Sequence, residues 1–312
     1  MTPDTKRLAS GLVMAALGAI AFSGKAIIVK LAYRYGVDAV TLIMYRMLFA
    51  LPIFVAMAWW ASRDKAPLAR KDWLGVLWLG TTGYYLASFL DFAGLAFISA
   101  SLERLILYLN PTLVVALGAV LYHRPISRGQ VAGMAVSYLG VLLVFGHELR
   151  LLGSDAAWGG VLVLLSAMSY AIYLSYSGQM VQRLGAMRLV GLATSVACLL
   201  CIAQFVALRP WSAVRVATEV VALSALNATL CTAVPVLLVM MAIERIGSGQ
   251  TAQVGMIGPM STILMGVLVL GEPFTAWVGA GTILVLLGIF LFSRGVRSGP
   301  VNQFKLSAKD CV

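Results

Sequence analysis

Long hydrophobic runs, separated by short polar segments, recur along the whole chain. A bilayer core of about 30 Å requires about 20 mostly apolar residues per crossing helix. Runs of that order predict ten transmembrane helices, near residues 8–32, 38–60, 73–94, 101–121, 127–146, 158–178, 187–207, 220–243, 251–270 and 274–293. Only very short loops bound the fourth and the ninth. The pattern therefore predicts an all-α, multi-pass integral membrane protein.

Composition supports the same class. The 312 residues are 61% hydrophobic and only 11% charged, with a mean hydropathy of +0.94. Because soluble domains carry about a quarter charged residues, a soluble chain of this kind would lack the polar groups to cover its surface. The net charge of +11 lies in short basic clusters between the apolar runs. That distribution favours a lipid bilayer as the partner and argues against nucleic acid.

The basic residues are unevenly shared between the two sides of the predicted bundle. The segment 62–73, rich in Lys and Arg, falls on the same side as both chain ends, whereas Arg150 and Arg209 belong to the sparser side. The positive-inside rule then places both termini in the cytoplasm. The first apolar run is longer than a typical signal core, so we expect it to be a retained first span. The expected location is the cell (inner, plasma) membrane.

The second half of the chain matches the first. Asn110-Pro111 aligns with Gly258-Pro259, and Gly36 aligns with Gly185. Each half contains five predicted helices, and an odd number inverts the second half relative to the first. The predicted organisation is a five-helix repeat at 8–146, an inverted repeat at 158–293 and a cytoplasmic tail at 294–312. Inverted repeats are typical of transporters with a substrate site near the bilayer midplane.

Each half also ends in a related pattern. The first contains "VLYHRPIS" and then "GMAVSYLGVLLV", and the second contains "VLVLGEPFT" and then "GAGTILVLLGIFL". In these segments the chain resembles two EamA repeats of the drug/metabolite transporter superfamily, over residues 8–293. It departs from that pattern where "HRP" replaces a Gly-Glu-Pro type turn, and where Ser195 stands opposite Arg46. These departures leave open whether the two halves contribute equally to the site.

Within that superfamily the chain is most similar to the YddG-type branch, whose members export amino acids. The resemblance implies a secondary transporter that exports small amphipathic metabolites, above all aromatic or other apolar amino acids. It also implies alternating access around a central cavity between the repeats. Export as opposed to import rests on the resemblance alone.

Polar and aromatic side chains at mid-depth are the candidate cavity. A buried tyrosine hydroxyl needs a partner, and amide side chains suit the polar groups of a zwitterion. The predicted cavity residues are Tyr84, Tyr85, Ser88, Tyr108, Asn110, Ser169, Tyr170, Tyr173, Asn227 and Gln253. The alternative for each is interhelical hydrogen bonding that only packs the bundle.

Two prolines interrupt predicted helices at matching places. Proline removes an intrahelical hydrogen bond, and in lipid the freed backbone must be buried in protein or line a wet cavity. We therefore predict that Pro111 and Pro259 are mirrored hinges beside the cavity, with a static kink as the alternative.

Ionisable residues inside membrane helices are expensive and usually functional. Those within or at the edge of the predicted helices are Lys25, Lys30, Arg46, Asp91, Glu103 and Arg104. We expect them to form a gate or ion pairs, Asp91 with Arg104 and Glu103 with Lys25 or Lys30. Carboxylates that nearby cations keep ionised do not carry protons. The substrate is therefore expected to move down its own gradient by facilitated diffusion.

The sequence contains no motif of an enzyme. Walker, GxGxxG, HExxH and GxSxG patterns are absent, and the CxxC of Cys198 and Cys201 lies in an apolar run without a charged neighbour. We expect no catalytic activity, no cofactor and no metal, with a small-molecule substrate as partner. The expected state is a monomer. The competing hypotheses are a multidrug or nucleotide-sugar carrier of the same fold, and a membrane scaffold or receptor that transports nothing.

Overall fold

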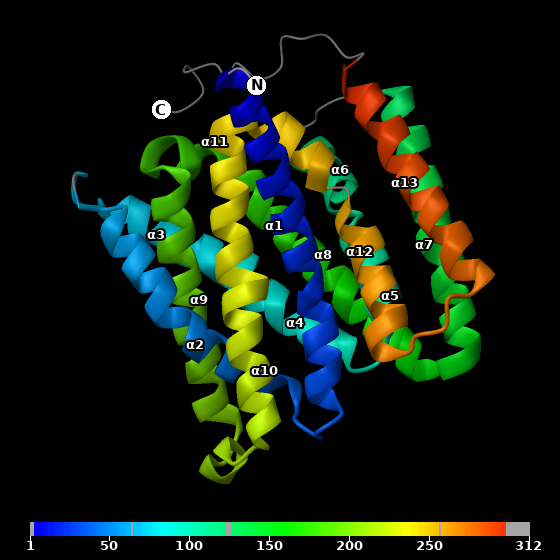
Figure 1. Cartoon of the computed structure of the whole chain (residues 1–312), viewed down its shortest axis with the longest axis horizontal. Helices are drawn as coiled ribbons and strands as arrows, with labels where there is room; N and C mark the ends of the chain where they lie inside the picture. Colours follow the sequence, from blue (N-terminus) through cyan, green and yellow to red (C-terminus); the bar gives the residue numbers. More distant parts are fainter. Residues whose placement is uncertain (1–2, 64, 123–125, 256, 298–312) are drawn as a thin grey trace.

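The structure, a computed structural model, describes residues 3–63, 65–122, 126–255 and 257–297. Within these ranges the chain forms helices joined by short connections, without a β-strand (Figure 1). The elements are α1 (Pro3–Tyr33), α2 (Ala39–Trp60), α3 (Arg70–Leu79), η1 (Gly80–Leu86), α4 (Ala87–Leu95), α5 (Ala100–Leu107), α6 (Asn110–Tyr122), α7 (Arg128–Leu152), α8 (Ser154–Leu184), α9 (Ala186–Leu208), η2 (Trp211–Val214), α10 (Thr218–Ala228), η3 (Thr229–Ala233), α11 (Val234–Gly255), α12 (Ile257–Met265), η4 (Gly266–Leu270) and α13 (Ala276–Arg297).

Eight of the described helices are long and apolar enough to cross a membrane. They correspond to the predicted spans other than the third and the ninth. The third is divided into α3, the π-helical η1 and α4. The ninth is a shorter apolar helix, Ile257–Leu270. The predicted tail, 294–312, lies outside the described residues from position 298 onward.

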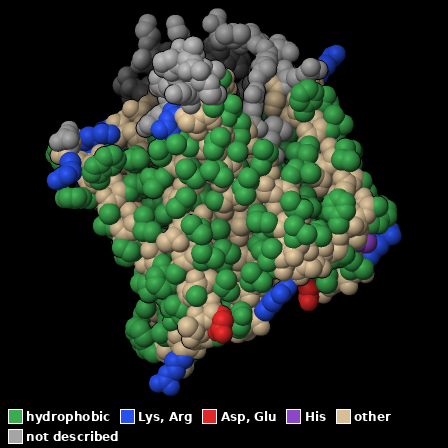
Figure 2. All heavy atoms as spheres, viewed as in Figure 1, with side chains coloured by type: hydrophobic (Ala, Val, Ile, Leu, Met, Phe, Trp, Pro, Cys, Tyr) green, Lys and Arg blue, Asp and Glu red, His purple; other side chains and the backbone are tan. Residues whose placement is uncertain are grey.

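The outer surface is that of a membrane protein. Figure 2 shows a face covered by hydrophobic side chains, with Lys and Arg toward its margins. All seven tryptophans are at least 45% exposed. Several lie at helix ends, such as Trp60 at the end of α2 and Trp277 at the start of α13. Tryptophan is enriched at the two membrane interfaces, so this placement agrees with a multi-pass membrane protein.

Asp38 defines the start of α2 and ties it to α9. Its carboxylate accepts the N–H groups of Val40 and Thr41, as an N-cap residue does. It also accepts from the guanidinium of Arg209 at 3.0 Å. Partial burial opposes ionisation, but the hydrogen bonds from Thr41 and Arg209 outweigh it and hold the pKa of Asp38 below its usual range.

Local features recur at matching positions of the two halves. The aligned glycines Gly36 and Gly185 both have positive φ, 73° and 85°, a conformation that glycine adopts without strain. The same alignment places the π-helical η1 opposite the π-helical η3. Threonines satisfy carbonyls in both segments: the Thr82 hydroxyl donates to Trp78 O, and the Thr232 hydroxyl donates to Asn227 O.

The helices pair across the two halves. The closest pairs are α7 with α13, α1 with α11, α2 with α9 and α4 with α8. In the repeat, α1 corresponds to α8, and α4 corresponds to α11, so the α1–α11 pair and the α4–α8 pair are equivalent. The α2–α9 pair and the α7–α13 pair each join two helices that correspond to one another. Each half therefore buries its helices against the other.

Glycines bring α7 and α13 into backbone contact. A Cβ built on Gly140 would lie 2.7 Å from the carbonyl oxygen of Gly281, and one on Gly133 would lie 2.6 Å from that of Gly288. Small residues at membrane helix interfaces allow such close approach. The small-residue face of α7 is thus used within the chain.

We predict that Gly140→Val destabilises the fold, because the added methyl groups force α7 and α13 apart. Overpacking of this kind costs about 1–3 kcal/mol. Gly146→Val is the matched control, since nothing lies within 4 Å of a Cβ at Gly146 of the same helix. Thermal unfolding in detergent should show a lower Tm for Gly140→Val alone, and equal Tm values for the two variants would contradict the packing.

Candidate substrate cavity

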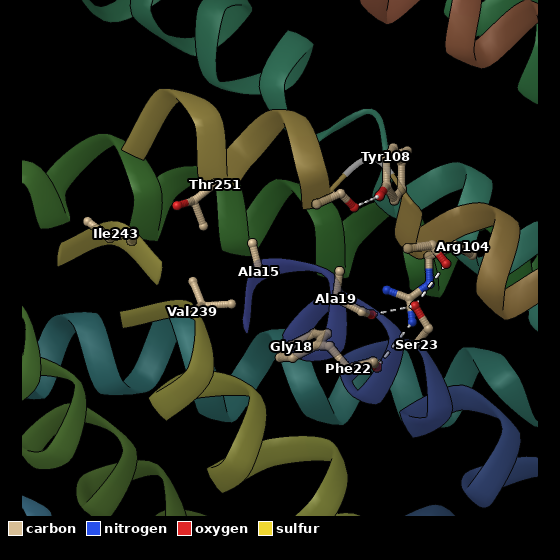
Figure 3. A pocket seen from close by; sticks show the side chains of 12 residues that line it. Ala15, Gly18, Ala19, Phe22, Ser23, Arg104, Tyr108, Val239, Ile243 and Thr251 are labelled. Carbon is tan, nitrogen blue, oxygen red and sulfur yellow. Dashed lines mark hydrogen bonds between the residues drawn. The ribbon is translucent and has the colours of Figure 1, made fainter. Parts of the chain in front are cut away.

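A cavity of about 320 Å³ lies between α1, α5, α11 and α12 (Figure 3). Its size is at the lower end of the range for small-molecule sites. The apolar part of the wall is formed by Ala15, Ala19, Phe22, Val239 and Ile243. The polar side chains on the wall are Ser23, Arg104, Tyr108 and Thr251.

The cavity lies beside the proline steps of both halves. Pro111 follows the break between α5 and α6, and Pro259 lies in the first turn of α12. The Tyr108 hydroxyl, next to the α5–α6 break, donates to the carbonyl oxygen of Gly255, four residues before Pro259, over 2.9 Å. The proline steps of the two halves therefore border one place in the bundle. Pro111 is exposed at this point, whereas Pro259 is buried.

Ser23 connects α1 to the Gly258-Pro259 step. Its hydroxyl lies 2.8 Å from the carbonyl oxygens of Ala19 and Gly258. Sequence reasoning missed Ser23, because a serine in an apolar helix commonly bonds a carbonyl of its own preceding turn. The contact with Gly258, on a helix of the other half, could be found only in the folded chain.

Arg104 is the charged side chain of the described cavity wall. It is 6% exposed, and Figure 3 shows its guanidinium directed toward Ser23 and Phe22 of α1. Its Nη2 donates to the carbonyl oxygen of Phe22 at 3.5 Å. Its Nε has no hydrogen bond within the described residues and lies 3.9 Å from Oε2 of Glu103. The guanidinium is thus buried but weakly bonded.

A buried charge cluster lies next to Arg104. Lys25 Nζ is 2.5 Å from Asp91 Oδ2 and 3.9 Å from Glu103 Oε1. Asp91 is 1% exposed and Glu103 is fully buried. Neither oxygen of Glu103 accepts a hydrogen bond from a described residue. Two cations and two carboxylates make the cluster formally neutral, which limits the large penalty of burying each charge.

Two of the predicted pairings are wrong. Asp91 pairs with Lys25 and not with Arg104, because the Arg104 side chain extends toward α1 and the cavity. Lys30 does not reach Glu103: it donates to the carbonyl oxygens of Leu95 and Ile98 at 3.2 and 2.8 Å. The closest approach of Glu103 to α1 is to Lys25, the other partner considered.

Arg46 and Asn227 adjoin the cluster, away from the cavity wall. The Arg46 guanidinium donates to Thr232 Oγ1 at 3.1 Å and lies over the Phe92 ring, 5.1 Å from its centroid. Asn227 Nδ2 donates to the carbonyl oxygen of Lys25 at 3.2 Å. These two predicted site residues therefore connect α2 and α10 to the charged centre.

Three predicted cavity tyrosines meet one another instead. Tyr84 and Tyr173 have hydroxyls 3.2 Å apart and rings edge to face, and Tyr170 stacks on Tyr173. The Ser169 hydroxyl donates to Thr82 O at 2.7 Å. These residues pack α8 against η1, and none lines the cavity described here.

The remaining predicted site residues are scattered. Tyr85 packs on the main hydrophobic cluster, Ser88 is partly buried, and Asn110 follows the α5–α6 break. The Oδ1 of Asn110 is buried without a described partner. The side chain of Gln253 lies outside the described residues. Of the predicted cavity residues whose side chains are described, Tyr108 is the one that lines this cavity.

Two glutamates that sequence reasoning left in loop ends hold the start of α5. Glu272, between η4 and α13, accepts the N–H groups of Ala100 at 2.7 Å and Ser101 at 3.3 Å, and the Ser101 hydroxyl at 2.8 Å. Glu148, near the end of α7, accepts the N–H and hydroxyl of Ser99. Carboxylates are stabilised at helix N-termini by free N–H groups and the helix dipole. We call these contacts of Glu148 and Glu272 the α5 lock.

The α5 lock lies at the end of the bundle opposite the start of α1 (Figure 1). Arg34 reinforces it by donating to the carbonyl oxygen of Leu270 at 2.8 Å. Because Glu272 and Leu270 belong to the second half and α5 and Arg34 to the first, these bonds close the halves on each other at that end.

Comparisons with known proteins identify relatives over almost the whole chain. A protein-family model described as the EamA-like transporter family matches residues 9–146 and 157–294. The chain is 30% identical over 275 residues to "Uncharacterized transporter YcbK" of Bacillus subtilis, covering 86% of this chain and 87% of that one. It is 25% identical over 243 residues to "Uncharacterized transporter YyaM" of the same bacterium, covering 77% and 79%. A crystal structure of another protein shares the fold, with a TM-score of 0.60 at 16% identity, over 93% of this chain and 99% of that chain.

We predict that Lys25→Met lowers stability by about 3–5 kcal/mol, because it leaves buried carboxylates without their nearest cation. The double variant Lys25→Met/Asp91→Leu should recover much of the loss, since the remaining Glu103 and Arg104 stay balanced in charge. Thermal unfolding of the detergent-solubilised variants measures both. A single variant as stable as the native chain would show that the Lys25–Asp91 pair does not form.

Proposed function

Because the chain belongs to the EamA-like transporter family, we propose that it is a secondary transporter that exports small amphipathic metabolites. Amino acids with aromatic or other apolar side chains, as in the YddG-type branch, are the foremost candidates. The observation that carries this proposal is the cavity, where α1 and α5 of the first half meet α11 and α12 of the second, beside the interrupted helix of α5 and α6 and the Gly258-Pro259 step. Such interrupted helices between repeats are where transporters bind substrate.

The proposed arrangement in the membrane is ten crossings as two inverted repeats, 8–146 and 158–293, with both termini in the cytoplasm. The recurrence of the π-helical segments and the exchange of helix pairs between the halves support the inversion. The start of α1 and the end of α13 lie at the same end of the bundle (Figure 1), as an even number of crossings requires. The use of the α7 glycines inside the chain supports a monomer. The cell (inner, plasma) membrane is the proposed location.

The asymmetry of the two ends supports alternating access. The cavity runs along α1 from Ser23 toward Ala15, and so toward the end where α1 begins. In the proposed orientation that end is cytoplasmic, and the α5 lock closes the opposite, outer end. This conformation is the one that loads substrate for export. Release outward then requires Glu272 to leave the N-terminus of α5, with Pro111 and Pro259 as hinges.

Facilitated diffusion remains the proposed energetics. Asp91 is held by Lys25 at 2.5 Å, and Glu103 lies 3.9 Å from both Lys25 and Arg104. Each carboxylate therefore has a cation within 4 Å, which suits a role in holding helices together. In this proposal Asp91 and Glu103 position helices and carry no protons.

Transport by the purified chain in liposomes tests the proposal. Liposomes loaded with labelled phenylalanine or leucine should release it faster than protein-free liposomes, and an imposed pH difference should not drive accumulation against the gradient. Absence of flux for amino acids, drugs and nucleotide sugars alike would favour the scaffold hypothesis. Uphill accumulation that Glu103→Gln or Asp91→Asn abolishes would instead make that carboxylate a coupling site.

A second test concerns the hinges. Pro111→Ala and Pro259→Ala each restore a backbone donor and should lower flux about tenfold, equivalent to roughly 1.4 kcal/mol in the barrier, while folded yield is retained. Pro210→Ala, in the connection between α9 and η2, is the control that leaves flux unchanged. Native flux in the double variant would identify the two steps as static kinks.

A further inference from the structure

In the part of the chain that the structure describes, the cavity wall presents a cationic side chain without a matching anionic one, and this imbalance of charge selects a ligand. Apolar groups form most of the wall, and Arg104 is its charged side chain within the described residues. Among the described side chains, no carboxylate lines the cavity: Glu103, next along the helix, is fully buried and is not part of the wall. Of these described groups, a ligand in this space therefore meets one cation and no anion.

The other polar donors of the wall are already engaged. The Ser23 hydroxyl bonds to the carbonyl of Gly258, that of Tyr108 bonds to Gly255 O, and that of Thr251 bonds to Gly247 O at 2.8 Å. A hydroxyl has a single hydrogen to donate. These three groups consequently fix the backbone and have none left for a ligand.

Arg104 has N–H donors that no described residue accepts. A guanidinium carries five N–H donors, and within the described residues this one makes a single long hydrogen bond, to Phe22 O at 3.5 Å. Glu103 lies 3.9 Å from its Nε, beyond hydrogen-bond distance. A buried charge with unfilled donors is unfavourable, and a carboxylate satisfies it through two parallel hydrogen bonds of about 2.7–2.9 Å.

The Arg104 side chain is directed so that a carboxylate in the cavity could reach its guanidinium. Figure 3 shows the Arg104 guanidinium at one end of the cavity, with Ala15, Val239 and Ile243 toward the other. A molecule with a carboxylate at one end and an apolar body would place its two parts against matching walls. None of the described side chains of the wall offers an amine a counter-charge.

We infer that Arg104 binds the carboxylate of the transported substrate, and that the cargo is a small apolar carboxylate for which an amino group is not required. This inference rests on the proposed function and narrows its substrate class. Apolar amino acids qualify through their carboxylate, and the corresponding organic acids qualify equally. Glu103 is the competing anion, which the substrate carboxylate replaces as the nearest partner of Arg104.

Titration calorimetry on the full chain in detergent tests the assignment with four probes of one shape. They are 3-phenylpropanoate, phenylalanine, 3-phenylpropanamide and phenylalaninamide. The two carboxylates should bind, and each amide should bind about tenfold more weakly or worse, because it forfeits a charge-assisted hydrogen-bonded pair. Equal binding of 3-phenylpropanoate and 3-phenylpropanamide overturns the inference. If binding requires the amino group, so that phenylalanine binds and 3-phenylpropanoate does not, the claim that organic acids qualify equally is overturned.

Variants locate the effect at Arg104. The double variant Arg104→Gln/Glu103→Gln removes one charge of each sign and should lose the preference for carboxylate over amide. Arg188→Gln removes a buried arginine that bonds Ser62 and Ala66 O elsewhere, and should keep it. Should the double variant fail to fold, Glu103→Gln alone decides: it removes the competing anion and should tighten carboxylate binding severalfold. Weaker or unchanged binding in Glu103→Gln overturns the assignment.

The two proposals fail separately. Binding of carboxylates without any flux in liposomes would contradict transport and leave the Arg104 site in place. Flux of the four probes at equal rates, with no difference between carboxylate and amide, would contradict the Arg104 site and leave transport in place.

Discussion

The ion pair of Lys25 and Asp91, with Nζ and Oδ2 2.5 Å apart, is the contact on which the centre of this bundle depends. Each charge alone would cost several kcal/mol in a low-dielectric interior, so α1 and α4 must stay together. Asn227 extends the constraint to α10 through the carbonyl of Lys25. Glu103 of α5 lies within 3.9 Å of Lys25. One neutral cluster thus sets the relative positions of helices from both halves, and the cavity wall follows from those positions.

The apolar surrounding also constrains the irregular parts of the helices. Backbone carbonyls that a break or a π-helical segment releases cannot turn to water, so side chains satisfy them. Thr82 and Thr232 do so in η1 and η3, and Tyr108 does so for the carbonyl of Gly255, which Pro259 leaves without a helical N–H donor. Because the hydroxyls at the cavity already donate to backbone carbonyls, Arg104 is the group left to bind a ligand. The same rule that stabilises the irregular backbone therefore determines which group faces a ligand.

The two halves share backbone features but divide the chemistry between them. All four charges of the central cluster come from the first half, on α1, α4 and α5. The second half supplies apolar wall, through Val239 and Ile243, and the glutamate that caps α5, Glu272. The position that aligns with Glu272 in the first half is Arg124, which lies outside the described residues. An arginine offers no acceptor to helix N–H groups, so the sequence of the first half does not repeat the acidic residue that caps α5. Unequal contributions of the halves, left open by the sequence, are thus evident in the charged residues.

The sequence by itself determined the helical membrane class, most helix positions, the places of the proline steps and the residues that form the charged centre. These follow from local quantities: the length of an apolar run, the loss of an N–H at proline, and the rarity of charge in lipid. It did not determine partners. Lys25 and not Arg104 meets Asp91, Tyr84 meets Tyr173 away from the cavity, and Glu272 reaches α5 from a loop end that reads as solvent-exposed. Periodicity specifies the face of a helix on which a residue lies, but the distance to a residue far along the chain depends on how helices cross. Only the tertiary structure decided those distances, and with them which buried charge was left facing the cavity.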